Sequence, residues 1–177
     1  MPNKFTNLQD AVESIATSLH NKMDDLLPEA NNCKEQKLLE AMRYSTLVGG
    51  KKLRPFLVCA SAGLFGVGRE VAIQTAAALE FIHVYSLIHD DLPAMDNDDF
   101  RRGQPSCHKK FGEAMAILAG DALLTEAFGH MLQLNGRYQP AQVLAAIELL
   151  VQYGGVRGMV GGQVLDVTTE DLTYSLP

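Results

Sequence analysis

The sequence predicts an all-α protein, an antiparallel bundle of helices, on three observations. Apolar residues recur every three or four positions through most of the 177 residues, which is the period of a helix with one buried face. Alternating stretches rich in Val, Ile and Thr, which would indicate strands, are nearly absent. Hydrophobic residues make up 47% of the chain, enough to bury a core. We therefore expect a single domain over residues 1–177.

Each expected helix is placed by this period and by residues that start or stop helices. The period covers residues 8–27, 34–47, 55–64, 70–91, 112–134 and 140–153. Pro55 suits a first helical turn, where its missing backbone N–H is not needed, and Gly66 and Gly68 end that third helix. Asn135 and Gly136 close the fifth helix in the same way. The short connections predict that successive helices pack antiparallel.

Composition argues against several classes of partner. A formal charge of −6 gives no general attraction to nucleic acid or anionic lipid. The widely spaced Cys33, Cys59 and Cys107 predict neither a disulfide framework nor a zinc site. The N-terminal stretch lacks the apolar run of a signal peptide, and no other run looks long enough to span a bilayer. We expect a soluble, cytoplasmic protein with no nucleic-acid partner and no stable membrane insertion.

The stretch "SLIHDDLPAMDNDDFRRGQPSCH", residues 86–108, concentrates five aspartates in ten positions. His83 and Asp90 share a face of the preceding helix, and Pro93 must stop or kink that helix, which returns Asp96 towards Asp90 and Asp91. The helix dipole disfavours carboxylates at a helix C-terminus, so stability alone does not explain the cluster. An oxygen-only site suits Mg²⁺ or Mn²⁺, which also bridge to phosphate. The other interpretation is a solvated acidic turn.

Upstream, "VGGKKLRPF" sets two glycines before Lys51, Lys52 and Arg54 at the start of a helix. Glycines let the backbone approach an anion, and the long cations and free N–H groups of a helix start supply positive charge. This is a possible phosphate cradle, although it lacks the glycine spacing of a Walker loop. The alternative is an ordinary turn with surface lysines. Arg101 and Arg102 either balance the aspartates locally or bind a second anion.

Four segments together resemble the trans-prenyl diphosphate synthases: "GGKKLRP", "FIHVYSLIHDDLPAMDNDDFRRGQPSCH", "FGEAMAILAGDALL" and "GGQVLDV". The four-residue spacer in DDxxxxD is similar to that of bacterial short-chain farnesyl diphosphate synthases. The resemblance implies an all-α bundle of the isoprenoid synthase type, a homodimer, and the Mg²⁺-assisted condensation of isopentenyl diphosphate with dimethylallyl or geranyl diphosphate. It also implies that the chain is truncated before the C-terminal helices of that fold.

The resemblance further assigns roles to individual residues. The catalytic groups it implies are Asp90, Asp91 and Asp96, which hold Mg²⁺ against the allylic diphosphate, and Arg101, which grips that diphosphate. The implied isopentenyl diphosphate pocket consists of Lys51, Arg54, His83, Arg102 and the backbone of Gly50. Gln163 and Asp166 match a further polar pair that lines the cavity.

Tyr85 lies five residues before Asp90, where the family uses a bulky side chain as the floor of the product cavity. By this resemblance growth stops at the fifteen-carbon farnesyl product; the alternative for Tyr85 is ordinary core packing. The family's second aspartate-rich motif, and a lysine and threonine that contact diphosphate, are missing from these 177 residues. We therefore expect weak binding of diphosphate and Mg²⁺ and slow turnover.

Two other functions remain open from the sequence. A class I terpene cyclase also ionises allylic diphosphates, but it has no need of a second-substrate pocket built from Lys51, Arg54 and His83. A non-catalytic subunit that pairs with a complete synthase is the other alternative. The intact Asp90, Asp91 and Asp96 favour descent from an active enzyme over this subunit.

Overall fold

A computed structural model describes residues 7–31 and 33–169 and divides the chain into two compact units, residues 1–134 and 135–177. The helices of the first unit are α1 (Leu8–Leu26), α2 (Gln36–Leu47), α3 (Leu53–Leu64), α4 (Arg69–Asp90), α5 (Cys107–Phe111) and α6 (Glu113–Leu132). The same unit holds the strands β1 (Phe100–Arg101) and β2 (Gln104–Pro105). The second unit contains α7 (Pro140–Gly154) and α8 (Met159–Thr169). The predicted all-α class is confirmed, whereas the single-domain boundary stays a prediction.

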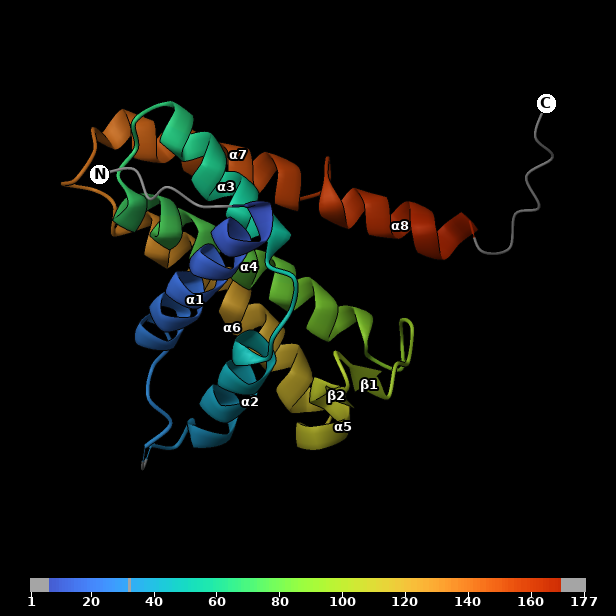
Figure 1. Cartoon of the computed structure of the whole chain (residues 1–177). Helices are drawn as coiled ribbons and strands as arrows, with labels where there is room; N and C mark the ends of the chain where they lie inside the picture. The colour runs from blue at the N-terminus through green and yellow to red at the C-terminus, as the bar shows by residue number, and fades with distance from the viewer. Residues whose placement is uncertain (1–6, 32, 170–177) are drawn as a thin grey trace. The chain divides into compact units, whose positions relative to one another are not determined.

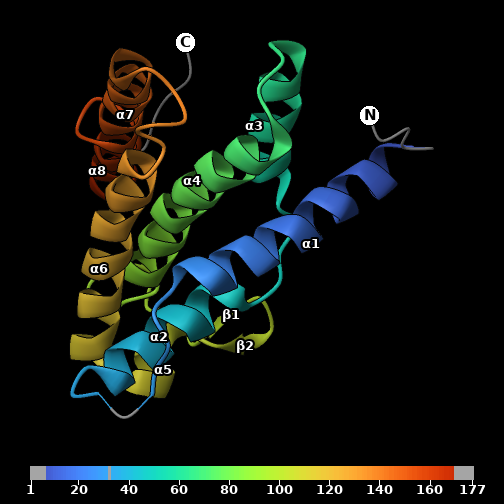
Figure 2. The same cartoon turned by 90° about the vertical axis from the view of Figure 1, so that its left-hand side faces the viewer.

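Helix α4 forms the centre of the first unit. It packs against α6, α3, α1 and α2, and Figures 1 and 2 show α4 and α6 running side by side. Its buried residues occupy several faces, because Ala76, Ala77 and Ala78 are all inaccessible and Phe81 and Val84 follow them. Small alanine side chains let neighbouring helices approach closely, so α4 is enclosed and its C-terminal end is firmly placed.

Local chemistry explains where the helices begin and end. The Asn7 side chain accepts a 2.8 Å hydrogen bond from the Asp10 backbone N–H and so caps α1. Helix α3 ends before Gly66, whose φ of +71° suits a residue without a Cβ, and the Val67 N–H returns to the Ala62 carbonyl at 3.0 Å. Pro55 lies in the first turn of α3, as expected, although the helix begins two residues earlier.

The acidic segment after α4 leads into a short hairpin that the sequence did not predict. Phe100 pairs with Pro105, and Arg101 with Gln104, in an antiparallel register. The Tyr44 hydroxyl on α2 donates a 2.8 Å hydrogen bond to the Pro105 carbonyl. This bond ties the hairpin, which carries Arg101 and Arg102, to α2.

The expectation that no run is long enough to span a bilayer was wrong, because some helical segments have the length and the apolar composition that a membrane span needs. Three helical segments meet both criteria: Arg69–Asp90, Glu113–Leu132 and Pro140–Thr169. In α4, 67% of the apolar window is buried within the structure, so core packing explains its composition. In Pro140–Thr169 only 6% of the window is buried. Alanines contribute to the mean hydropathy of these helices without forming an obvious aliphatic run.

Candidate active site

The loop between α2 and α3 is shaped by a close approach of Arg102. The Arg102 guanidinium donates a 3.1 Å hydrogen bond to the Val48 carbonyl. It also lies over Gly50, where an added Cβ would be 3.0 Å from the Arg102 Cζ atom. Gly50 has φ +150°, which L side chains rarely adopt. Glycine is therefore required here for both its backbone angle and the space above it.

One cavity of ≈ 310 Å³ gathers the residues expected to bind isopentenyl diphosphate. It is lined by Gly50, Lys51, Lys52, Leu53, Arg54, Glu80, His83 and Arg102. Three parts of the chain contribute: the loop with the start of α3, helix α4, and the hairpin. The five residues predicted for this pocket thus lie around the same space. From the sequence, Lys52 was one of the loop cations with no specific role, and no role was predicted for Glu80.

His83 sits among charged groups on the wall of this cavity. Burial lowers the pKa of its imidazole; Glu80 opposes that shift, and Arg54, Arg102 and Lys52 add to it. The low pKa keeps the ring neutral near pH 7, so that one ring nitrogen can donate and the other accept a hydrogen bond.

Lys52 and Glu80 form a buried ion pair at the same cavity. The Lys52 Nζ lies 2.7 Å from the Glu80 Oε1, and their side chains are 6% and 2% exposed. Removing one partner of such a pair would leave an uncompensated buried charge, which costs about 3–5 kcal/mol. Lys52 also has φ +46° in the left-handed region, which costs an L residue about 1–2 kcal/mol. The ion pair is well placed to hold the residue in that conformation.

The aspartates at the end of α4 divide into two groups. The Asp96 backbone N–H donates a 2.9 Å hydrogen bond to the Asp90 carbonyl, so the turn folds back as Pro93 predicted. Burial raises the pKa of the Asp90 carboxyl, and the adjacent Asp96 carboxylate raises it further. Two oxygen ligands this close together fit a divalent cation, which would relieve their repulsion. Among the described residues, however, no three acidic, histidine or cysteine side chains converge as a metal site.

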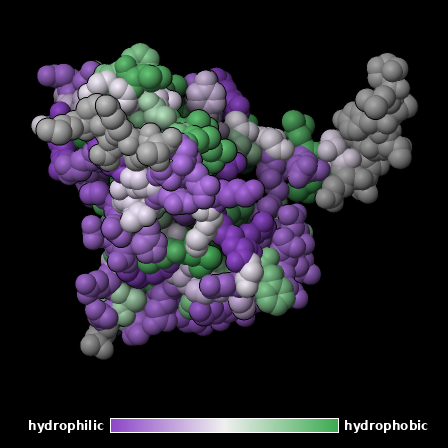
Figure 3. All heavy atoms as spheres, viewed as in Figure 1, coloured by the Kyte–Doolittle hydropathy of each residue, from purple (hydrophilic) through white to green (hydrophobic). Residues whose placement is uncertain are grey.

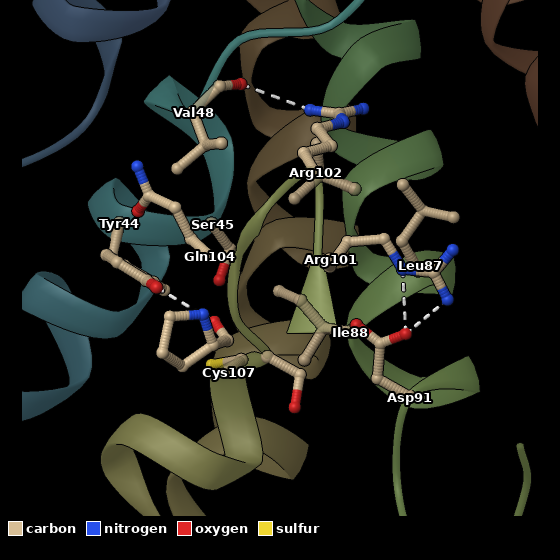
Figure 4. A pocket seen from close by; sticks show the side chains of 13 residues that line it. Tyr44, Ser45, Val48, Leu87, Ile88, Asp91, Arg101, Arg102, Gln104 and Cys107 are labelled. Carbon is tan, nitrogen blue, oxygen red and sulfur yellow. Dashed lines mark hydrogen bonds and ion pairs between the residues drawn. The ribbon is translucent and has the colours of Figure 1, made fainter. Parts of the chain in front are cut away.

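Asp91 instead lies against Arg101, as Figure 4 shows. The Arg101 Nε donates a 2.8 Å hydrogen bond to the Asp91 Oδ1, and Asp98 accepts a further bond from Arg101 at 3.2 Å. The hydrogen bond to Asp91 is the main cause of the raised Arg101 pKa. In this structure Asp91 is therefore paired with an arginine. Its role as a metal ligand, and that of Arg101 towards a diphosphate, stay predictions.

Figure 4 also shows the neighbouring Arg101 and Arg102 pointing to different partners, the first to Asp91 and the second to Val48. The small pocket between them has a volume of ≈ 30 Å³. That volume is far too small for a diphosphate ester.

Tyr85 faces the interior on α4. It is 8% exposed, and its ring meets the His89 ring edge-on at 5.7 Å between centroids. The His89 Nε2 lies 3.1 Å from the Ile117 carbonyl of α6. Gly120 leaves room for the imidazole, since an added Cβ would be 2.1 Å from that nitrogen. The structure thus shows Tyr85 in the core; its role as a cavity floor stays a prediction.

Gln163 and Asp166 lie on α8 in the second unit, where Asp166 is exposed and Gln163 half-buried. Their expected place beside the other polar residues therefore stays a prediction.

The family model described as Polyprenyl synthetase matches residues 35–176 of this chain. The chain belongs to the polyprenyl synthetase family. Membership confirms the resemblance drawn from the lysine loop and the aspartate-rich segment. It also places the cavity beside Lys51 in a protein family that builds prenyl chains.

Individual polyprenyl synthetase relatives are similar to this chain over most of its length. Farnesyl diphosphate synthase of Haemophilus influenzae is 52% identical over 139 residues, which cover 78% of this chain and 47% of the relative. The large subunit 1 of the chloroplastic heterodimeric geranylgeranyl pyrophosphate synthase of Arabidopsis thaliana is 50% identical over 77% of this chain and 37% of its own. This chain therefore spans less than half the length of these relatives.

A solved structure agrees with the fold. The crystal structure of an FPP/GFPP synthase from Zymomonas mobilis, in an apo form, superposes with a TM-score of 0.88 at 44% identity. The match covers 93% of this chain and 59% of the crystallised chain. The agreement supports an all-α isoprenoid synthase fold for this chain.

Proposed function

We propose that this chain carries the substrate-binding half of a prenyl diphosphate synthase, which joins isopentenyl diphosphate to dimethylallyl or geranyl diphosphate. The observation that carries the proposal is the convergence of Lys51, Arg54, His83 and Arg102 on one cavity. Asp90 is the last residue of α4 and Asp96 lies in the turn that follows, where the aspartate pair fits a cation. Sites for two anionic substrates in one unit are what a condensation of two diphosphates requires.

The chemistry follows from the charges of the substrates. The allylic carbon–oxygen bond breaks with its electron pair on the diphosphate, the isopentenyl double bond attacks the resulting cation, and a proton is lost from the neighbouring carbon. Mg²⁺, held by Asp90 and Asp96 when bound, would neutralise the leaving diphosphate. Lys51, Arg54 and Arg102 would hold the isopentenyl diphosphate through charge-assisted hydrogen bonds, which orients its double bond.

Farnesyl diphosphate is the product we propose, because Tyr85 is a bulky side chain in the interior one turn before Asp90. Relatives named for farnesyl and geranylgeranyl products have nearly equal identity, 52% and 50%. Overall similarity therefore does not choose between the products. We also propose a homodimer that acts in the cytoplasm.

The cavity favours this synthase over a class I terpene cyclase. A cyclase rearranges one diphosphate ester and has no use for a second cationic pocket formed by Lys51, Arg54 and His83. A product assay with and without isopentenyl diphosphate separates the two. A non-catalytic subunit would instead bind a complete synthase in a pull-down and form no product alone.

Arg54→Ala tests the proposed pocket. Loss of one charge-assisted hydrogen bond, worth about 1.5–3 kcal/mol, should weaken isopentenyl diphosphate binding about 10- to 100-fold. Isothermal titration calorimetry on the 177-residue chain measures the dissociation constant. Lys37→Ala is the matched control, because this exposed lysine on α2 removes the same charge outside the cavity. Equal affinities in both variants, or no binding by the wild-type chain, would contradict the proposal.

A further inference from the structure

Lys52 lines the cavity, but its charge is already neutralised by a protein carboxylate. Lys52 is buried against Glu80 at 2.7 Å, whereas Lys51 and Arg54 on either side of it in the chain are exposed and line the open cavity. The loop carries three cationic side chains within four residues, and the fold turns one of them, Lys52, inward. The burial of Lys52 bears on how Lys51 and Arg54 are held.

The backbone of Lys52 connects the loop to α3. Lys52 is the residue that immediately precedes α3, with φ +46° and ψ +32° in the left-handed region. Its carbonyl accepts a 3.1 Å hydrogen bond from the Phe56 N–H, the first turn of the helix. The conformation of this one residue therefore sets the direction in which the loop enters α3, and with it the directions of Lys51 and Arg54.

The side chain of Lys52 connects the loop to α4. Glu80 belongs to α4, the enclosed central helix, and is 2% exposed. An anchor on α4 fixes the loop to the buried central helix of the first unit. Glu80 also lies one helical turn before His83, so the same helix positions both the anchor and a cavity wall. The pair is neutral as a whole, which leaves the charge of Lys51, Arg54 and Arg102 available to an anion.

We propose that Lys52 and Glu80 are positioning residues: their ion pair holds the loop in its left-handed conformation and thereby aims Lys51 and Arg54 into the diphosphate cavity. Neither residue needs to touch the substrate. This inference rests on the proposed function of the cavity, but the effect on loop conformation can be measured without any ligand.

Two changes test the pair. Glu80→Gln keeps the shape of the side chain and removes its charge, while Lys52→Arg keeps a cation that can still reach Glu80. Gln74→Ala is the control for general destabilisation, because Gln74 is a buried residue of the same helix that donates a 3.0 Å hydrogen bond to the His130 carbonyl far from the cavity. Hydrogen–deuterium exchange of residues 48–53 in the 177-residue chain, followed by mass spectrometry, reports the loop directly.

The expected result is faster exchange of residues 48–53 in Glu80→Gln, and rates near wild type in Lys52→Arg and Gln74→Ala. Calorimetry with inorganic pyrophosphate, at a temperature where circular dichroism shows all variants folded, should give about tenfold weaker binding in Glu80→Gln, with recovery in Lys52→Arg. A purely structural pair would lower the melting temperature but leave both the loop exchange and the dissociation constant of the folded protein unchanged. That outcome would overturn the inference.

Glu80→Gln leaves Lys52 unpaired in the interior, and that variant could fail to fold. The double change Lys52→Met with Glu80→Leu removes both charges together and avoids a buried lone charge. It should fold and show the same fast loop exchange and weak pyrophosphate binding. Exchange as slow as wild type in the double variant would refute the positioning role. If wild-type protein binds no pyrophosphate, the proposed function fails, while the exchange experiment still decides whether the pair fixes the loop.

Discussion

Arg101 and Arg102 are adjacent in the chain yet contact different parts of the first unit. Arg101 pairs with Asp91, and Arg102 reaches back to the Val48 carbonyl over Gly50. The left-handed φ of Arg102, +53°, reverses the chain between the two short strands and contributes to this separation. Single side chains thus link the hairpin to the end of α4 on one side and to the lysine loop on the other.

Asp96→Asn should weaken the Mg²⁺-dependent binding of dimethylallyl diphosphate by about tenfold or more. The physical reason is that the Asp96 carboxylate lies close enough to Asp90 to raise the pKa of the Asp90 carboxyl, and the variant halves the charge of the pair that attracts the cation. Calorimetric titration with and without Mg²⁺ measures the effect. Asp25→Asn, an exposed acid of α1, controls for net charge. Unchanged Mg²⁺ dependence in Asp96→Asn would refute the assignment.

Helix α4 and helix α6 approach closely where His89 enters the space above Gly120. The contact fixes the last turn of α4, and therefore Asp90, relative to α6. The position of the helix end depends on the absence of a side chain at residue 120 and on the bond between His89 and the Ile117 carbonyl. Packing of this kind is specified by a pair of residues far apart in the sequence.

Gly120→Ala should destabilise the protein by about 1–3 kcal/mol, because the new Cβ would overlap the His89 imidazole and displace it from the Ile117 carbonyl. Gly129→Ala is a matched change on the same helix, with its nearest neighbour, the Glu126 Oε2, at 3.9 Å. It should be neutral or stabilise by about 0.5–1 kcal/mol through helix propensity. Thermal unfolding followed by circular dichroism compares the two. Similar melting temperatures for both variants would contradict this account.

The surface of the molecule carries apolar residues that the described core does not cover. Figure 3 shows a mostly hydrophilic face interrupted by separate apolar patches. On α3, Leu53, Leu57 and Leu64 are exposed, and Phe65 follows them at 85% exposure. In the second unit, Leu149 and several other apolar residues of α7 and α8 are exposed as well. Exposed apolar groups of this kind are consistent with a protein–protein interface. Dimerisation itself stays a prediction.

Acid should weaken the folded protein as the pH falls from 7 towards 5.5. Burial lowers the pKa of His130 and of His83, so the unfolded chain binds more protons in this range and stability rises with pH. At His130, Glu126 and Gln133 oppose the shift. The stability that the neutral ring gives is present above pH 6.5 and is lost as the pH falls through the lowered value. Urea unfolding at several pH values measures this slope.

His130→Gln removes one of the two titrating rings and should reduce that pH dependence. His20→Gln on α1 is the control, because this histidine is exposed. A slope unaffected by His130→Gln would show that another group is responsible.

Helix positions could be predicted from the sequence because local patterns set them. The period of apolar residues, Pro55, Pro93 and the Asn135–Gly136 pair act over a few residues, and the helices found at 8–26, 36–47, 53–64, 69–90, 113–132 and 140–154 match those expected to within a few residues. The hairpin, α5 and α8 were missed. The first two are too short to show a period, and α8 carries glycines that weaken its helical pattern.

The motifs also indicated which residue types would bind diphosphate, since Lys51, Arg54, His83 and Arg102 can be read directly from the chain. Only the tertiary structure decided that these residues share a cavity, that Asp91 pairs with Arg101, and that Lys52 turns inward to Glu80. Local propensity carries no information about contacts between residues ten to fifty positions apart. Those contacts depend on how closely distant segments approach one another. Gly50 in the lysine loop leaves room for Arg102, and Gly120 on α6 leaves room for His89.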